Sequence, residues 1–159
     1  MRLYRIYNER RSPDDFQGAK LLGGRWNPKG YGVLYSSAHL SLACLEKLVH
    51  LGPHANPGKM RYAYTDIAPV HDSLDPRKEF VHQGEQRTAE IGKQWIVHAK
   101  SLAVRVPSVL IPEEDNVLLN PFHEDYASLQ WDSKPFDWDQ RLLELVGRVQ
   151  AEGSAELLG

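Results

Sequence analysis

The sequence has 159 residues, of which 42% are hydrophobic and 25% are charged, and its formal net charge is −2. These values are typical of one globular domain that buries about two thirds of the surface of its unfolded chain. They exclude a strongly basic nucleic-acid-binding protein, and no apolar stretch reaches the roughly 18–20 residues that a membrane-spanning helix needs.

The N-terminal sequence and the cysteine content predict a cytoplasmic protein. The first residues, MRLYRIYNERR, lack the apolar core of a secretory signal. Cys44 is the only cysteine, so no disulfide can form within the chain. It lies in the apolar helical pattern LSLACLEKLV, which favours a buried small hydrophobic residue over a catalytic thiol.

The first half of the chain alternates strand patterns with one helix. Residues 2–7 alternate as a strand does, and residues 8–24 are polar and contain glycines, which predicts turns and a loop. A second strand is predicted at residues 32–36, followed by a helix over 38–51 and a third strand over 60–67. The apolar stripe expected on that helix consists of Leu42, Leu45 and Val49.

The second half begins with an irregular segment, residues 68–84, that contains prolines and a glycine. A helix is predicted over 85–98, a strand over 102–111 and a short strand or turn over 116–121. Because proline cannot donate to a strand ladder, Pro107 predicts an edge strand, a bulge or two separate pieces. An amphipathic helix is expected near the C-terminus, and this irregular order of elements predicts the α+β class.

The stretch GGRWNPKG, Gly23 to Gly30, raises the question of what holds Arg25. Two glycines allow the backbone to turn sharply and to approach a ligand closely. A guanidinium on such a turn can bind phosphate through two parallel hydrogen bonds. The same pattern also fits an ordinary turn with a solvated arginine.

Glu46 lies at the margin of the apolar stripe of the helix over 38–51. It is one helical turn from Leu42 and from Val49. It is therefore either a surface glutamate that pairs with a neighbouring cation or a partly buried carboxylate that faces a cleft. In the second case it can stabilise a developing positive charge or take a proton.

Three further polar or aromatic residues each have two interpretations. Ser108 follows a proline in an apolar run. Its hydroxyl is either packed in the core and bonded to the backbone or a hydrogen-bond donor at a strand kink. Tyr35 ends a strand, where it either packs in the core or stacks on a flat ligand ring. Asn120 caps a turn or binds a polar group of a ligand. The histidines show no metal-ligand spacing, and neither a Walker A motif nor a Rossmann glycine motif is present.

The ordered set of motifs resembles one known family. RLYRI, GGRWNPKG, GVLYSS followed by LACLEKLVH, LAVRVPSVLIPEEDNVLLNP and PFDWDQRL occur in this order. Together they resemble the RES domain family, named for an arginine, a glutamate and a serine, over residues 1–142. The resemblance assigns these three residues to Arg25, Glu46 and Ser108.

The resemblance implies both a fold and a function. The fold is a single compact mixed α/β domain similar to that of ADP-ribosyltransferase toxins, with an NAD⁺-binding cleft. RES proteins are toxins of bacterial type II toxin–antitoxin pairs whose antitoxin carries an Xre-like helix-turn-helix domain. Their activities are NAD⁺ degradation, by hydrolysis or phosphorolysis, and ADP-ribosylation of a protein. Residues 143–159 extend beyond the family pattern and are expected to form a C-terminal helical tail.

The residue types suit cleavage of the nicotinamide–ribose bond, which develops oxocarbenium character at the ribose. Glu46 can stabilise that cation, Arg25 can hold the pyrophosphate and Tyr35 can stack on the nicotinamide. Ser108 can hydrogen-bond the nicotinamide amide or the ribose. Asn120, which matches the asparagine of the family's LLNP motif, can support it.

We therefore predict a toxin that uses NAD⁺ as substrate without a metal and arrests growth by depleting it. The acceptor is water, phosphate or a protein side chain, and Arg105 or Lys29 could supply an additional cation for phosphate. Mono-ADP-ribosylation of a protein is the alternative reaction, and a non-catalytic antitoxin-binding module is the alternative of another class. The expected partners are the Xre-like antitoxin, NAD⁺ and, for phosphorolysis, inorganic phosphate, with no nucleic acid and no membrane.

Overall fold

The structure is a computed structural model, and it describes residues 1–51, 57–75, 85–98, 100–144 and 146. Its strands form one six-stranded antiparallel sheet in the order β4-β5-β2-β1-β3-β6. The strands are β1 (Arg2–Asn8), β2 (Leu34–Ser37), β3 (Met60–Asp66), β4 (Ala103–Pro107), β5 (Asp115–Leu119) and β6 (Asp132–Phe136). The helices are α1 (Gln17–Leu22), α2 (Leu40–Val49), α3 (Glu85–His98) and the 3-10 segment η2 (Glu124–Ser128). The predicted α+β class is confirmed.

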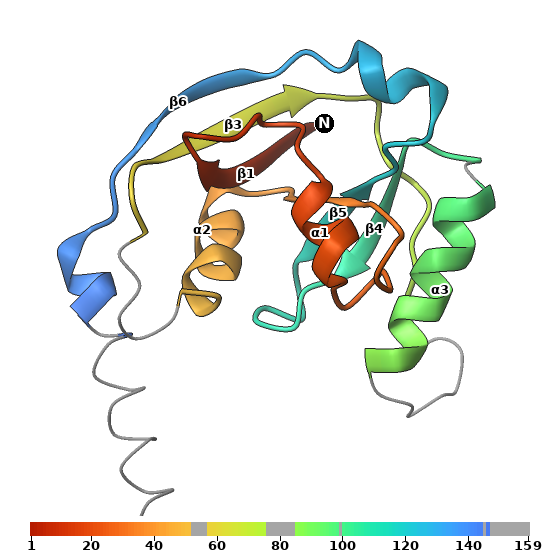
Figure 1. Ribbon diagram of the computed structural model, residues 1–159, viewed down its shortest axis with the longest axis horizontal. Coiled ribbons are helices and arrows are strands. Elements are labelled where there is room, and N and C mark those ends of the chain that lie inside the picture. Colours follow the sequence, from red (N-terminus) through yellow and green to blue (C-terminus); the bar gives the residue numbers. More distant parts are fainter. Residues whose placement is uncertain (52–56, 76–84, 99, 145, 147–159) are drawn as a thin grey trace, which may run out of the picture.

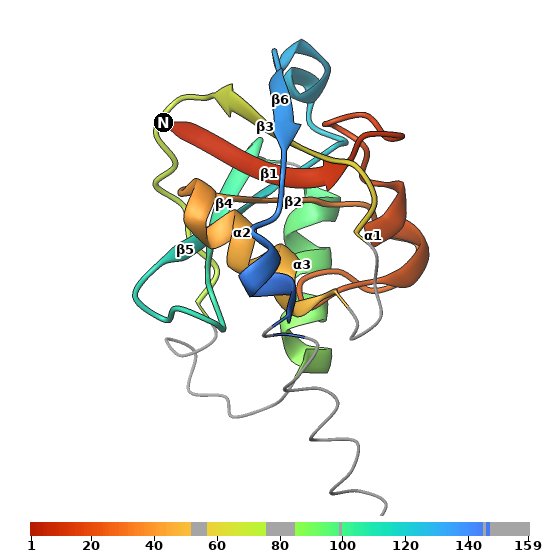
Figure 2. The ribbon, with the colours of Figure 1, turned by 90° about the vertical axis from the view of Figure 1, so that its left-hand side faces the viewer.

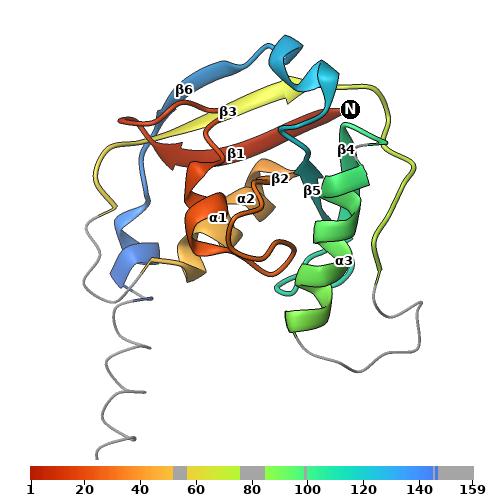
Figure 3. The same cartoon turned by 45° about the vertical axis from the view of Figure 1, so that its right-hand side comes forward.

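The three α-helices lie beneath an arch made by β1, β3 and β6 (Figure 1). Helix α2 lies toward one end of the molecule, where it contacts β1 and β2, and α3 lies toward the other end. Figure 3 shows α3 running alongside β4 and β5. The chain that follows β6 comes down on the same side of the molecule as α2 (Figure 2).

Two apolar clusters use opposite faces of the sheet, because successive side chains of a strand point to opposite faces. On β5, Val117 and Leu119 belong to one cluster and Leu118 belongs to the other. The Leu118 cluster includes Ile96 of α3 and Trp26 of the glycine-rich loop, both nearly inaccessible to solvent. The face of the sheet that packs against α3 is thus also the face that receives this loop.

The sequence predicted β1, β3 and α3 with close agreement in their bounds, and it placed β4 within a longer segment. The short strand or turn expected over 116–121 corresponds to β5, which begins one residue earlier and ends two residues earlier. Strand β4 is an edge strand that ends at Pro107, as one of the alternatives for that proline required. Residues 8–24 are not entirely loop, since they contain the short helix α1. Strand β6 was not predicted, because its sequence DSKPF has little apolar character and its side chains are mostly exposed.

The predicted apolar stripe of α2 was partly wrong. Leu42 is buried, but Leu45 is 39% exposed and Val49 is 50% exposed. Helix α2 instead packs through Leu42, Ala43 and Leu48. The predicted C-terminal helix and tail fall mostly on residues 145 and 147–159, which lie outside the described residues, as do residues 52–56 and 76–84.

Within the described part of the chain, none of the helices combines the length and the apolarity that a membrane span requires.

Gly92 allows α3 to touch the glycine-rich loop. A Cβ atom at Gly92 would lie 1.8 Å from the carbonyl oxygen of Trp26 and 2.8 Å from its carbonyl carbon. We expect Gly92→Ala to lower the free energy of unfolding by about 1–3 kcal/mol, because the helix must move away from the loop.

Gly18 in α1 is the matched control, since nothing lies within 4 Å of a Cβ placed there. Gly18→Ala should leave stability unchanged or raise it by up to about 1 kcal/mol through helix propensity. Chemical denaturation of both variants measures the difference, and equal stabilities would contradict the close approach of α3.

Candidate active site

A cleft of about 890 Å³ opens between the glycine-rich loop, helix α2 and strands of the sheet. Its volume lies within the roughly 300–1,000 Å³ of small-molecule sites. Arg25, Tyr35 and Glu46 all line it, so the fold brings together three of the residues that the sequence singled out. Ser108 lies directly behind Glu46 and contacts its carboxylate.

The glycine-rich loop turns as its sequence predicts. Gly23 has a φ of 76°, in the left-handed region that favours glycine. The backbone of Gly24 exchanges hydrogen bonds with that of Asn27, at 2.8 and 3.3 Å, which closes the turn around Arg25. A Cβ at Gly24 would lie 2.7 Å from the hydroxyl of Tyr35, so this position has no room for a larger residue.

Asn27 and Tyr35 tie the loop to the sheet. The fully buried amide of Asn27 donates to the carbonyl oxygens of Ala19, at 2.8 Å, and Tyr31, at 2.7 Å. The hydroxyl of Tyr35 donates to Asn27 Oδ1 at 2.8 Å and accepts from the backbone N–H of Trp26 at 3.0 Å. Tyr35 therefore uses its hydroxyl to hold the loop and leaves its ring as a wall of the cleft.

The backbone of Arg25 is held by helix α3. Its backbone carbonyl accepts a hydrogen bond of 2.7 Å from the hydroxyl of Thr88 in α3. Burial raises the pKa of Tyr35 to about 12, while the Trp26 backbone hydrogen bond and the charge of Arg25 act in the opposite direction. Arg25 thus brings a positive charge to the wall of the cleft that Tyr35 also forms.

Helix α2 presents one face to the cleft. Ala43, Glu46, Lys47 and His50 line it, and their spacing of three and four residues is that of one helical face. The Glu46 carboxylate accepts hydrogen bonds from Ser108 Oγ at 2.9 Å and from Asn116 Nδ2 at 2.5 Å. Both donors reach the same oxygen, Oε1, so neither of them uses Oε2.

The hydroxyl of Ser108 is itself held by hydrogen bonds to the backbone. It is 4% exposed, and its hydroxyl oxygen accepts from the backbone N–H groups of Leu110 and Ile111, both at 3.1 Å. These two amide donors leave the hydroxyl proton for Glu46. Both sequence-based interpretations of Ser108 are therefore correct, because a buried hydroxyl at the end of β4 is also a hydrogen-bond donor.

Cations outnumber carboxylates along one part of the cleft. Lys47, Arg5 and Arg11 line it, and Asp15 pairs with Arg11 at 2.9 Å. Burial lowers the pKa of Lys47, and the charges of Arg5 and Arg11 lower it further. Arg5 itself is fixed by hydrogen bonds of 2.8 and 3.2 Å to the carbonyls of Pro13 and Asp15. This part of the cleft is therefore suited to a negatively charged ligand.

Some predicted residues lie elsewhere. Asn120 is fully buried and lines no part of the cleft, because its amide donates to Ile96 O near the end of α3 and accepts from Phe122 N, both at 3.0 Å. Its turn-capping interpretation fits this geometry, and the ligand-binding one does not. Arg105 pairs with Asp115 away from the cleft, and Lys29 does not line it.

Sequence reasoning missed Asn116, Arg5 and Lys47. Asn116 was predicted only as the first residue of a short strand or turn, and its contact with Glu46 joins positions 70 residues apart. Arg5 is a residue of β1 and Lys47 a residue of α2, and although they lie in the stretches RLYRI and LACLEKLVH, neither was singled out as a site residue. The only signal available was that Lys47 adjoins Glu46 in the helix.

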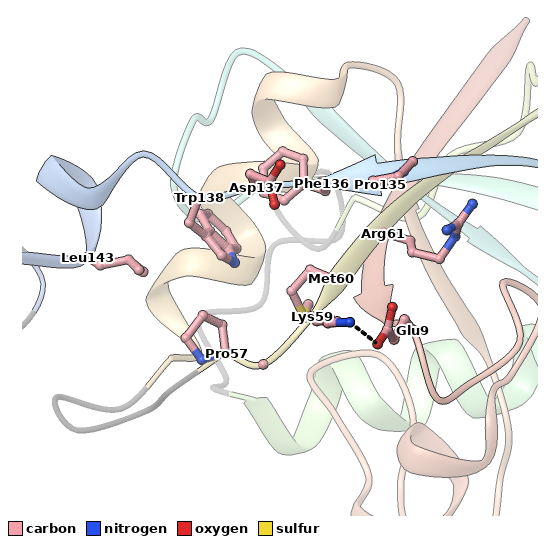
Figure 4. A pocket seen from close by; sticks show the side chains of 11 residues that line it. Glu9, Pro57, Lys59, Met60, Arg61, Pro135, Phe136, Asp137, Trp138 and Leu143 are labelled. Carbon is pink, nitrogen blue, oxygen red and sulfur yellow. Dashed lines mark ion pairs between the residues drawn. The ribbon is translucent and has the colours of Figure 1, made fainter.

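A second, smaller pocket of about 500 Å³ lies between the start of β3 and the chain after β6 (Figure 4). Met60, Phe136 and Trp138 form its apolar walls, and Lys59 faces Glu9 at 4.0 Å near its rim. It shares no lining residue with the cleft. Among the described residues, no three His, Cys, Asp or Glu side chains come together as a metal site in either place.

Known proteins resemble this chain in sequence and in fold. The RES domain family matches residues 2–139. "Toxin Res" of Yersinia enterocolitica is 32% identical over 151 residues, which cover 89% of this chain and 99% of that protein. The "Prs ADP-ribosylating toxin" of a Sphingobium species is 34% identical over 124 residues, or 71% of this chain and 75% of that protein.

A solved structure shows the same fold at low sequence identity. A chain in the crystal structure of the M. tuberculosis MbcT-MbcA toxin–antitoxin complex superposes with a TM-score of 0.64 at 15% identity. The match covers 94% of this chain and 88% of that one.

Removing the hydroxyl of Tyr35 tests how the loop is held. Tyr35→Phe leaves Asn27 Oδ1 and the Trp26 N–H without their partner, so we expect a loss of about 1–3 kcal/mol in the free energy of unfolding. Tyr62→Phe on β3, where the ring stacks on Tyr64, is the control and should change stability by less than about 0.5 kcal/mol.

The two tyrosine variants should also differ in how their stability depends on pH. Because burial raises the Tyr35 pKa from 10.0 to about 12, the unfolded chain ionises this group at lower pH than the folded protein does. Its contribution to stability is complete below pH 10 and declines as the pH approaches 12. Urea denaturation between pH 10 and 12 should show a decrease in the free energy of unfolding that is absent in Tyr35→Phe and present in Tyr62→Phe.

Proposed function

The chain belongs to the RES domain family, and on that premise we propose that it is the toxin of a toxin–antitoxin pair that consumes NAD⁺ by cleaving the nicotinamide–ribose bond. One observation carries this proposal: the carboxylate of Glu46 is fixed by Ser108 and Asn116 inside a cleft that Arg25 and Lys47 also line. NAD⁺ has a positively charged nicotinamide at its reacting end and a negatively charged pyrophosphate. A site for it therefore needs a fixed carboxylate for the first and cations for the second.

Glu46 acts on the reacting end of the substrate. Departure of nicotinamide as a neutral molecule moves positive charge onto the ribose, and a fixed carboxylate stabilises that charge without having to reorganise. Ser108 and Asn116 hold one carboxylate oxygen, and the other is then available to face the ribose. The ring of Tyr35 offers a flat surface on which nicotinamide can stack.

Cations hold the pyrophosphate. Arg25, the residue that matches the family arginine, is the cation that we propose for this role, and Asn27 and Tyr35 tie its loop to the sheet. Lys47 and Arg5 add positive charge to the same cleft. An anionic ligand relieves the repulsion among these cations, so its binding is favoured by the protein's own electrostatics.

The acceptor of the ADP-ribosyl group is water, phosphate or a protein side chain. We favour water or phosphate, which deplete NAD⁺. Transfer to a protein is the second candidate reaction, and it is favoured by one relative, the Sphingobium protein, which is named as an ADP-ribosylating toxin. The Xre-like antitoxin is proposed as the partner from the family resemblance, supported by the similarity in fold to a chain of a toxin–antitoxin complex.

The test is release of nicotinamide from NAD⁺ by the purified protein, and Glu46→Gln is the decisive variant. Glutamine keeps an oxygen that can accept from Ser108 and Asn116 but carries no charge, so we expect kcat to fall about 100-fold or more with the fold intact. Glu144→Gln, on the exposed chain after β6, is the matched control and should turn over normally.

Four outcomes separate the alternatives. Free ADP-ribose indicates hydrolysis, and a phosphorylated ADP-ribose formed only with phosphate indicates phosphorolysis, as mass spectrometry shows. Label transfer from NAD⁺ to a protein in a cell extract indicates ADP-ribosylation. If neither nicotinamide release nor label transfer is detected, the enzymatic proposal is overturned and the non-catalytic antitoxin-binding module is favoured.

Lys47→Met tests the cationic part of the cleft. Methionine keeps the apolar stem and removes the charge, so the KM for NAD⁺ should rise several-fold while kcat changes little, as expected when ground-state and transition-state binding weaken equally. Lys59→Met, at the rim of the second pocket, is the control and should leave KM unchanged.

The pH dependence has a defined sign. Because the pKa of Lys47 lies below its ordinary value, the lysine loses its charge at a lower pH than usual, and the KM of the native protein should rise as the pH increases through that pKa. Lys47→Met should lack this rise. If the KM of Lys47→Met equals that of the native protein at every pH, Lys47 does not contribute to substrate binding.

A further inference from the structure

We propose that Asn116 is a positioning residue for Glu46 and that Ser37 orients it, so that a three-residue chain of hydrogen bonds sets the place of the reacting carboxylate. The inference rests on the proposed function for its kinetic consequence, but the chain itself is visible in the geometry. Ser37 Oγ lies 2.6 Å from Asn116 Oδ1, and Asn116 Nδ2 lies 2.5 Å from Glu46 Oε1.

Strand register creates this arrangement. In the antiparallel sheet, Asn116 of β5 lies directly opposite Ser37 of β2 on one side and Val106 of β4 on the other. Side chains at opposite positions of antiparallel strands share a face. Tyr35 is two residues before Ser37 on the same strand and therefore belongs to that face too, which is the one that lines the cleft.

The chemistry of the three groups fixes the direction of the hydrogen bonds. A carboxylate only accepts, so the Asn116 amide must turn its NH₂ group toward Glu46. Its carbonyl oxygen then faces Ser37, and the serine hydroxyl must donate to it. Ser37 is 3% exposed, so water has little access to compete for this hydroxyl.

Two donors on neighbouring strands hold one oxygen of Glu46. Ser108 follows the end of β4 and Asn116 lies near the start of β5, and both reach Oε1. Ordering a glutamate side chain costs about 1.5–2 kcal/mol of rotamer entropy, which hydrogen bonds to a charged group offset. Without Asn116, the carboxylate keeps one anchor and can rotate about its terminal bonds.

Asn116 acts through Glu46 rather than on the substrate. Its amide oxygen is occupied by Ser37 and one amide N–H by Glu46. Loss of this residue should therefore change the reaction step more than the binding of NAD⁺. A displacement of a reacting group by about 1 Å can lower a rate by up to about 100-fold.

The experiment is a double-mutant cycle on NAD⁺ cleavage with the full chain. Asn116→Ala should lower kcat about 10- to 100-fold and change KM by less than about two-fold. In the Glu46→Gln background, where the carboxylate charge is already absent, the same change should cause no further loss. A role limited to stability predicts instead equal losses in both backgrounds, and that result would overturn the proposal.

Ser37→Ala provides a milder variant if Asn116→Ala does not fold. It removes only the donor that orients the amide, and kcat should fall about two- to ten-fold with KM unchanged. Ser36→Ala is the matched control, because Ser36 is 4% exposed and donates to the backbone carbonyl of Val117 at 2.7 Å. Equal kcat values for these two serine variants would contradict the role of Ser37.

A crystal structure of Asn116→Ala, or of Ser37→Ala if that variant alone folds, separates this inference from the proposed function. If the native protein does not cleave NAD⁺, the proposed function fails, but the structure still tests the hydrogen-bond chain. We expect the Glu46 carboxylate to move from its place beside Ser108 or to occupy several positions. An unmoved, well-ordered carboxylate overturns the inference whatever the reaction is.

Discussion

The buried amide of Asn27 is the contact on which the rest of the site depends. It joins α1, the glycine-rich loop and β2 through hydrogen bonds to Ala19, Tyr31 and the hydroxyl of Tyr35. A buried amide left without these partners costs about 1–3 kcal/mol for each lost bond, so the loop has one strongly preferred arrangement. That arrangement buries Trp26 against α3, which in turn has a glycine at the point of closest approach.

The two halves of the site are therefore built in different ways. The cationic part draws on several elements: Arg25 stands on the glycine-rich loop, whose backbone groups and buried asparagine are hydrogen-bonded to neighbouring elements, whereas Lys47 belongs to α2 and Arg5 to β1. The anionic part depends on a helix side chain, Glu46, which is held by Ser108, just after β4, and by Asn116 of the adjacent strand β5. Both halves meet at the sheet face that carries Tyr35 and Asn116. Such an arrangement suits the substrate proposed above, since fixed charges do not have to reorganise when a ligand of opposite charge binds.

Local patterns predicted elements that carry apolar and aromatic residues and failed where an element is mostly exposed or lines a cleft. Strands β1 and β3 and helix α3 were predicted close to their bounds. Strand β6 was missed because an edge strand that is exposed on most of its length needs no apolar alternation. The apolar stripe predicted for α2 was right at Leu42 and wrong at Leu45 and Val49, and Val49 lies on the face that lines the cleft, where polar and apolar side chains are mixed.

The sequence alone determined which chemical groups are present and in which order: an arginine on a glycine turn, a carboxylate on the next helix and a serine after a strand, together with the family to which that order belongs. Only the tertiary structure decided which atoms meet. Asn116 and Asn120 are four residues apart near β5, about 13 Å in an extended strand, and although only Asn120 precedes a proline, this does not reveal which of the two meets Glu46. Strand register places the first against Glu46, whereas the end of α3 takes the second as its cap. That choice is made by contacts between residues distant in sequence, for which a single sequence contains no local signal.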